Sequence, residues 1–407
     1  MLLLPLIYTG VASSVKLSEL ESLWPVFIMS LVILLISYIV TVCMGYLPCF
    51  RMQKQTYFTP LCIASTFPNI VALPIIIFPT LCEYGVVQDL VKEDVDMEDM
   101  GESSLMDVCN KQANAVVFTY FFGFSLVFWS IGHRTLVNLS NVNVRPVPGG
   151  PSEVDTEMVT TRQNGKFSII RKRLVLTCSC AKDVIIDVLK SPGFVALILG
   201  FVTACITPLQ RALFEVGGSL RVVGSALESL SNAGTTFATI VVAASLVKQE
   251  EEQAEDEDEE MEPCVEHENE SGCKPIERKT TILGRLSNCL RSTRMQSETM
   301  KIYIWQVSAR LLVTPGIVFF LLLKLDCAGL LDSVPNIAKL VLLINSAVPG
   351  ALVVVVILKA QGLADEAAAV SKAYLPSYTL SVFTLAMWSS IGLMAFRSDS
   401  AACGSGT

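Results

Sequence analysis

Long apolar blocks, separated by polar segments, run through the whole chain. Several blocks reach about 20 residues, the length that a helix needs to cross a hydrocarbon core of about 30 Å. Short segments of alternating apolar and polar residues, the pattern of a membrane β-barrel, do not occur. The pattern predicts an all-α polytopic membrane protein with a partial span at residues 2–15 and full spans at 22–47, 57–83, 114–133, 191–209, 219–248, 302–325, 335–359 and 369–396.

Two hydrophilic segments interrupt the series of spans, at residues 134–190 and 249–300. The second begins with the acidic run QEEEQAEDEDEEME, and low hydrophobicity with high charge predicts a flexible loop. The loops on the side of these two segments hold 21 Lys and Arg residues, against 8 on the other side. Because cytosolic loops carry the excess of Lys and Arg, both segments are predicted to be cytosolic and residues 84–113 to lie on the opposite side.

Composition supports the membrane assignment and excludes little else. Hydrophobic residues make up 52% of the chain and charged residues 17%, whereas soluble domains carry about 25% charged residues. The net charge of −8 says little about partners, because the acidic residues are concentrated in one loop. The expected partners are the lipid bilayer and a small-molecule substrate, with no nucleic acid, and homodimerisation is left open.

One predicted span contains helix breakers at membrane depth. TFPNIVALPIIIFPT, at residues 66–80, carries Pro68, Pro74 and Pro79 together with the amide of Asn69. A proline inside a helix removes a backbone hydrogen bond and costs about 3 kcal/mol. In hydrocarbon, non-helical backbone is tolerated only where it is buried in protein or lines a cavity.

A second predicted span, LLINSAVPGALVVVVILKAQG at residues 342–362, is interrupted in the same way. Two broken spans in different halves of a chain point to a transporter site, because each break leaves free N–H groups and a positive helix end that suit an anion. The alternative is a pair of proline kinks packed against neighbouring helices. The pattern predicts substrate contacts from Asn69, Asn345 and Ser346, and a helix crossing at Pro74, Pro349 and Gly350.

Other polar residues within the spans are weaker candidates. Arg310 would be costly at mid-bilayer, or its side chain would extend to the cytosolic surface. Glu228 and Asn232 are possible accessory polar groups for the substrate or a coupled proton. Cys82 and Cys109 bracket the predicted non-cytosolic loop, where a disulfide and two unpaired thiols are both compatible with the sequence.

Catalytic and metal-binding patterns are not found in the sequence. The chain lacks G-x-S-x-G, H-E-x-x-H and Walker motifs, which disfavours an enzyme and a self-contained ATP-driven pump. His133 and His267 are the only histidines, too few for a usual zinc or haem site, and no C-x-x-C occurs. The sequence predicts a protein that is not an enzyme and that holds neither a metal nor an organic cofactor.

An ordered series of segments resembles the auxin efflux carrier family, specifically its PIN-LIKES (PILS) branch. ALPIIIFPTLCEYG and the following DVCNKQANAVVFTYFFGFSLVFW are similar to the branch's N-L-P-L-x-x-V-P-x-x-C stretch, its second cysteine and its aromatic fifth span. SPGFVALILGFVTACITPLQRALFEVGGSLRVVGSALESLSNAG and ARLLVTPGI resemble its later spans. The segment from Asn345 through Trp388, which includes Tyr374, resembles the ninth and tenth spans.

The resemblance implies a ten-helix fold of two inverted five-helix repeats, with two crossing broken helices. The segment at residues 2–15 matches the end of the family's second span, so the first span is expected to be missing from this sequence. The implied organisation is an N-terminal membrane repeat at 1–133, a basic linker loop at 134–190, the sixth and seventh spans at 191–248, a disordered acidic loop at 249–300, the eighth to tenth spans at 301–397 and a short tail at 398–407.

The resemblance also implies a function, namely a secondary carrier for an indole-3-acetate-like anion that works by alternating access in the endoplasmic reticulum membrane, with the plasma membrane as the alternative. The crossing departs from the family pattern, because Ala72 and Ala351 replace asparagines. These departures leave a more apolar organic anion as an alternative substrate. The rival function is a membrane receptor or regulatory protein that binds a small ligand without transporting it.

Overall fold

The computed structural model is all-helical in the parts of the chain that it describes, apart from one isolated antiparallel bridge. It describes residues 3–14, 20–50, 52, 57–70, 72–83, 87, 90, 102–143, 188–189, 191–215, 217–231 and 300–397. The predicted acidic loop, most of the basic linker loop, the tail and Asn232 lie outside these residues.

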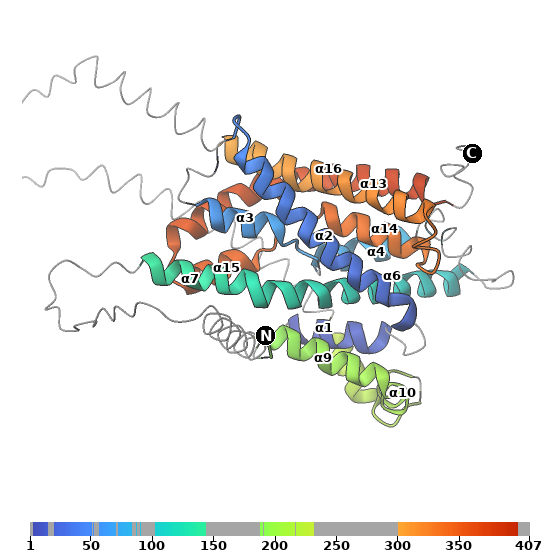
Figure 1. Ribbon diagram of the computed structural model, residues 1–407. Helices are drawn as coiled ribbons and strands as arrows, with labels where there is room; N and C mark the ends of the chain where they lie inside the picture. Colours follow the sequence, from blue (N-terminus) through green and yellow to red (C-terminus); the bar gives the residue numbers. More distant parts are fainter. Residues whose placement is uncertain are drawn as a thin grey trace, which may run out of the picture.

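Four helices in the described residues are long and apolar enough to cross a membrane. Their apolar spans are Leu23–Tyr46 in α2 (Leu20–Tyr46), Leu105–Leu139 in α6 (Glu102–Val127), η3 (Phe128–Gly132) and α7 (His133–Asn143), Met300–Cys327 with η4 (Ser308–Val313) and α13 (Thr314–Cys327), and Ala364–Ala395 in α16. In Figure 1 three of these helices run across the view, and α2 crosses the three obliquely.

Four shorter helices form the centre of the molecule. They come in two successive pairs, α3 (Phe58–Thr66) with α4 (Ala72–Glu83), and α14 (Asn336–Ala347) with α15 (Val353–Ala360). α3 and α15 lie toward one end of the molecule, and α4 and α14 toward the other (Figure 1). The core is densest around α14, where every residue from Ile337 to Ala347 is buried.

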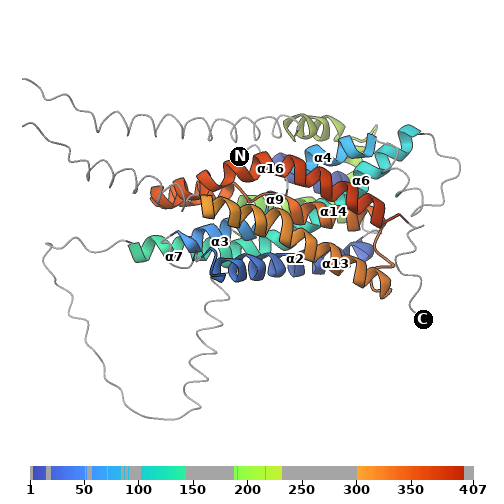
Figure 2. The ribbon, with the colours of Figure 1, turned by 90° about the horizontal axis from the view of Figure 1, so that it is seen from above.

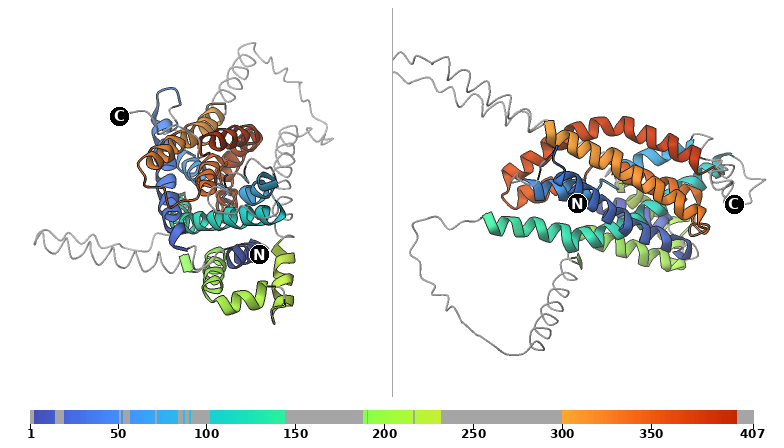
Figure 3. Two further views of the ribbon diagram at one scale, coloured as in Figure 1. Left: turned by 90° about the vertical axis from the view of Figure 1, so that its right-hand side faces the viewer. Right: turned by 45° about the horizontal axis from the view of Figure 1, so that its top comes forward.

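A separate group of helices lies on one side of this arrangement. It consists of α1 (Leu3–Ser14), α9 (Pro192–Cys205) and α10 (Thr207–Phe214), with α1 packed on α9 (Figure 3). α6 contacts α1 and α9 as well as α2, α4 and α14, so it joins this group to the rest of the molecule.

Several predicted boundaries differ from the structure. α6 begins at Glu102, so the helix predicted to start at residue 114 includes the end of the predicted loop at 84–113, and α16 begins at Ala364 instead of residue 369. The helix that was expected to end at residue 133 continues to Asn143, so the first part of the predicted linker loop is helical. The predicted straight span at 191–209 stops at Cys205, and α10 departs at an angle of 102°. Pro208, in the first turn of α10, explains the turn, because it has no N–H group to donate to the carbonyl of Ala204 and its ring would clash with that carbonyl in a continuous helix.

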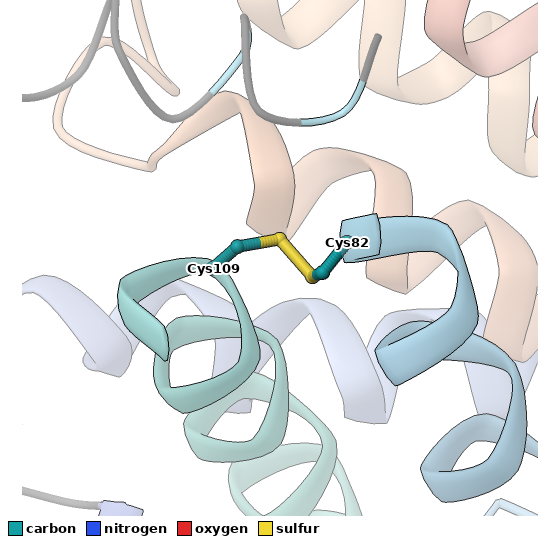
Figure 4. Close-up of a disulfide and its surroundings, with 2 residues drawn as sticks. All are labelled: Cys82 and Cys109. Atoms are coloured by element: carbon teal, nitrogen blue, oxygen red, sulfur yellow. A yellow bond between two sulfur atoms is a disulfide. The ribbon is translucent and has the colours of Figure 1, made fainter. Parts of the chain in front are cut away.

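A disulfide joins Cys82, near the end of α4, to Cys109 in α6 (Figure 4). The two Cα atoms are 5.9 Å apart. α4 and α6 lie side by side in Figure 2 as well as in Figure 1. The bridge, one of the two states that the sequence allows, fixes the end of α4 that lies farther from the interruption after α3.

Candidate functional site

Two extended segments pair at the centre of the molecule. The first interruption, residues 67–70, follows α3, and the second interruption, residues 348–352, follows α14. Their backbones form an antiparallel bridge between Pro68 and Gly350. The amide of Asn69 donates to the carbonyl of Pro349 at 2.8 Å, and the amide of Ala351 donates to the carbonyl of Phe67 at 2.7 Å. Each interruption therefore provides hydrogen-bond partners for backbone groups that the other leaves without helical partners.

Prolines explain where the helices stop. Phe67 and Val348 each precede a proline, which disfavours helical backbone, and both residues are extended, with ψ of 110° and 138°. Pro74, by contrast, lies beyond the first interruption in the first turn of α4, where a missing N–H group removes no helical hydrogen bond. In the first half of the chain the proline at the pairing position is Pro68.

Two tyrosines from α16 hold the paired segments together. Tyr378 donates from its hydroxyl to the carbonyl of Gly350 at 2.9 Å, and it accepts a hydrogen bond from Asn69 Nδ2 at 3.0 Å. Tyr374, one helical turn earlier, donates to the carbonyl of Ala351 at 2.9 Å. The side chain of Asn69 is thereby oriented, while its half-buried amide keeps one N–H hydrogen that Tyr378 does not use.

Gly350 is required by the closeness of this packing. A Cβ atom at this position would lie 2.7 Å from Cε1 of Tyr374 and still closer to the carbonyl oxygen of Ala64. Real Cβ contacts are not that short, so the backbone of the second interruption can approach α3 and α16 only where the residue is glycine.

A buried cation is bound to the end of α14. The side chain of Arg310, from η4, is only 1% exposed, so it does not extend to the cytosolic surface. Its Nε donates to the carbonyl of Val348 at 2.8 Å, one terminal nitrogen donates to the carbonyl of Asn345 at 3.2 Å, and the other donates to Ser37 Oγ at 2.8 Å. Within the described residues, Arg310 is paired with no carboxylate.

Ser37 extends this contact to the other broken pair. Its hydroxyl accepts from Arg310 and donates to the carbonyl of Thr66, the last residue of α3, at 3.2 Å. Arg310 therefore faces the negative ends of both α14 and α3. The positive ends of α4 and α15 also meet at the crossing, and neither helix has an acidic residue in its first turn. The crossing thus has compensated C-terminal helix ends and uncompensated N-terminal ones, an arrangement that favours an anion.

Asn345 and Ser346 are close to the crossing but face the protein interior. Both residues are 0% exposed. The hydroxyl of Ser346 donates to the carbonyl of Leu343 at 2.6 Å, and neither polar atom of the Asn345 amide has a hydrogen-bond partner among the described residues. In this structure neither side chain has surface open to a ligand.

The remaining predicted site residues are elsewhere. Glu228 lies on a helix at residues 221–231, where it accepts a hydrogen bond from Arg221, and it lines a cavity beside α4 rather than the crossing. Asn232 is outside the described residues. Within the part of the chain that the structure covers, no group of three or more His, Cys, Asp or Glu side chains could hold a metal ion.

Sequence reasoning did not assign Ser37 and Tyr378 to the site. The spacing of Tyr374 and Tyr378 was an available signal, because residues four apart lie on the same face of a helix. The signal for Ser37 was weaker, namely a polar residue within the apolar run of α2. Its partner Arg310 is 273 positions away, and no local pattern links the two.

Comparison with known proteins decides the family. The sequence model of the membrane transport protein family matches residues 1–261, which is more than half of the chain. The chain belongs to this family. The match includes the first interruption and Glu228, and it ends before Arg310 and the second interruption. No curated protein and no solved structure matches the chain.

Membership gives the coarse function. The family is one of membrane transporters, so this chain is an integral membrane transport protein, and neither an enzyme nor a receptor that binds without transporting is favoured.

Proposed function

We propose that this protein is a secondary carrier that moves a small organic anion of the indole-3-acetate type by alternating access at the helix crossing. The observation that carries the proposal is the distribution of charge around that crossing. A cation faces the C-terminal ends of α3 and α14, and no acidic residue lies in the first turn of α4 or α15. A carboxylate would therefore be stabilised at the two N-terminal ends.

Asn69 is the proposed contact to the substrate. It is part of the first interruption, its side chain is half-buried, and Tyr378 holds it in place through one of its two amide hydrogens. The second hydrogen can be donated to a carboxylate oxygen, in a charge-assisted hydrogen bond that is stronger than a neutral one. The crossing residues Pro68, Pro349 and Gly350 position the backbone around this contact.

The finer assignments follow from the resemblance and are part of the same proposal. We assign the chain to the PIN-LIKES branch, with the ten-helix fold of two inverted repeats, and place it in the endoplasmic reticulum membrane. In this scheme the paired helices α3–α4 and α14–α15 are the two broken spans. They move relative to the separate group formed by α1, α9 and α10, carrying the substrate across the membrane.

The proposal is tested by transport in reconstituted vesicles. Purified full-length protein is inserted into liposomes, and uptake of labelled indole-3-acetate and of other aromatic and aliphatic carboxylates is measured against protein-free liposomes. The carrier predicts saturable uptake of at least one carboxylate, and competition by the unlabelled compound. Binding of a carboxylate with uptake no faster than in protein-free liposomes would overturn the carrier in favour of a receptor.

A further inference from the structure

A cavity of about 500 Å³ lies between α1, of the separate helix group, and α4, of the first broken pair. Its walls come from α1, α4, α6 and the helix at residues 221–231. This volume is within the range of about 300–1,000 Å³ that is usual for small-molecule sites. The wall from α4 begins at Ile75, in the first turn of that helix, so the cavity extends along α4 from a point next to the crossing.

The lining of the cavity combines apolar and polar side chains. Phe118 supplies an aromatic ring, and Ile75, Ile76 and Pro79 supply aliphatic surface. The side-chain amide of Asn114 makes no hydrogen bond within the described part of the chain, so both its donor and its acceptor can serve a ligand. The cavity therefore suits a small molecule with an apolar ring and one polar group.

An ion pair borders the cavity. Glu228 is the one ionisable side chain among the described residues that line the cavity. Its Oε1 accepts from Arg221 Nη1 at 3.1 Å, and the two side chains are 38% and 36% exposed, respectively. An ion pair that is this accessible to water contributes only about 0.2–1 kcal/mol. A second carboxylate can therefore compete for the guanidinium.

We propose that this cavity binds the organic anion by exchange of its carboxylate for Glu228 on Arg221. The ring of the anion packs against Phe118 and Ile75, Arg221 transfers its hydrogen bond to the incoming carboxylate, and Glu228 turns toward water. Arg221 is thus the specificity-determining cation, and Glu228 is an internal competitor that occupies it in the absence of substrate.

This inference rests on the proposed function, since it names a second place where the transported anion is held. It differs from the crossing in its chemistry. The crossing offers helix ends and an amide, whereas the cavity is lined by Glu228, whose partner Arg221 lies just behind it, outside the lining, at 3.1 Å. Because Ile75 lies in the first turn of α4, directly after the first interruption, the cavity is a stage on the route to the crossing along α4.

The test measures equilibrium binding of labelled indole-3-acetate to the full-length protein in detergent, with indole-3-acetamide as a neutral analogue of the same shape. Loss of a charge-assisted hydrogen bond predicts that Arg221→Gln weakens the binding of indole-3-acetate by about tenfold or more. Removal of a weak competing ion pair predicts that Glu228→Gln strengthens it by about two- to fivefold. Neither variant should alter binding of the acetamide, which carries no charge.

A matched control is available on α10, where Arg211 and Glu215 form an ion pair of 3.5 Å between side chains that are 67% and 66% exposed. Neither residue lines the cavity, and this pair, unlike Arg221 with Glu228, includes no residue that does. The affinities of Arg211→Gln and Glu215→Gln for indole-3-acetate should be within about twofold of the wild-type affinity, as expected for an exposed pair remote from the ligand.

The outcomes separate the two proposals. If Arg221→Gln binds indole-3-acetate as the wild type does, or if Glu228→Gln binds it more weakly, the proposed exchange at the cavity is wrong. The proposed carrier function still holds in that case if the wild type transports a carboxylate. A wild type that transports none of the carboxylates overturns the proposed function itself.

Discussion

The two interruptions are similar in sequence and differ in structure. Each has an asparagine followed by a proline four or five residues later. Asn69 lies within the extended segment, where its half-buried amide is oriented by Tyr378. Asn345 lies before its extended segment, in the last turns of α14, and its amide is buried with no hydrogen-bond partner in the part of the chain that the structure describes. A shared sequence pattern therefore gives one side chain directed at the crossing and one directed into the protein.

The two halves are also anchored differently. The end of α4 is tied to α6 by the disulfide between Cys82 and Cys109. The end of α14 is bound by the guanidinium of Arg310, which also reaches α3 through Ser37. The first half thus has a covalent anchor far from the crossing, and the second half has an ionic anchor at the crossing itself.

The largest expected effect comes from removing the ionic anchor. Arg310→Met leaves the carbonyls of Val348 and Asn345 and the hydroxyl of Ser37 without their donor. Because each hydrogen bond to a charged group contributes about 1.5–3 kcal/mol, the variant should lose at least about 3 kcal/mol of stability. Thermal unfolding in detergent measures this, and Arg310→Lys should fall between Met and Arg, since one ammonium group cannot reach all three acceptors. A melting temperature of Arg310→Met equal to that of the wild type would disprove the anchor.

Removing the covalent anchor should have a comparable or smaller effect. The disulfide closes a loop between residues 27 positions apart, for which chain entropy predicts about 3 kcal/mol. Cys82→Ser/Cys109→Ser should unfold at a lower temperature than the oxidised wild type. Cys327 also takes part in a disulfide, which the double variant keeps, so reductant should still lower the melting temperature of the double variant, but by less than that of the wild type. If reductant shifts the double variant as much as the wild type, another disulfide is responsible.

Overpacking the crossing gives the next effect. Gly350→Ala places a methyl group against Ala64 and the ring of Tyr374, and such overpacking costs about 1–3 kcal/mol. Gly316→Ala is the matched control, because its new Cβ would meet its nearest neighbour, Trp388, at an ordinary 3.7 Å. Chemical denaturation of both variants compares them, and equal stability of the two would show that the crossing is not tightly packed.

The smallest expected effect is an increase in stability. Asn345→Leu keeps the branched shape of the side chain and removes two buried polar atoms that have no partner. The cost of such groups predicts that stability rises by about 1 kcal/mol. A fall of the same size in thermal unfolding would mean that the amide of Asn345 has a hydrogen-bond partner after all, and the contrast with Asn69 would be lost.

Local patterns were enough to predict the long spans and the two interruptions. Apolar blocks predicted the spans at 22–47 and 302–325 to within a few residues, because membrane-crossing length and hydrophobicity are properties of contiguous sequence. The polar ends of the helix predicted at 114–133, and the bend after Cys205, were not predicted. The prolines and Asn69 also marked both interruptions. The sequence did not reveal that Pro74 lies in the first turn of α4, where it breaks no helical hydrogen bond, or that Pro68 pairs with Gly350. Both depend on where α4 begins.

The long-range contacts of the site could not be predicted in this way. Arg310 bonds to Ser37, and Asn69 bonds to Tyr378, across 273 and 309 positions. Whether an arginine extends to the membrane surface or is buried depends on acceptors that only the folded chain brings near it. The same is true of Asn345 and Ser346, whose residue types suggested substrate contact although α14 is buried on all sides.

The most direct test of the central claim compares the two halves in one transport measurement. Initial uptake of a transported carboxylate into liposomes is measured for the wild type, Asn69→Ala and Ser346→Ala at equal amounts of folded protein. Loss of a hydrogen bond to a charged substrate predicts that Asn69→Ala lowers the ratio of maximal rate to KM by about tenfold or more. Ser346→Ala should stay within about twofold of the wild type, because its hydroxyl is bonded to the backbone of its own helix. Transport by Asn69→Ala at the wild-type rate would contradict the assignment of the substrate site to the crossing.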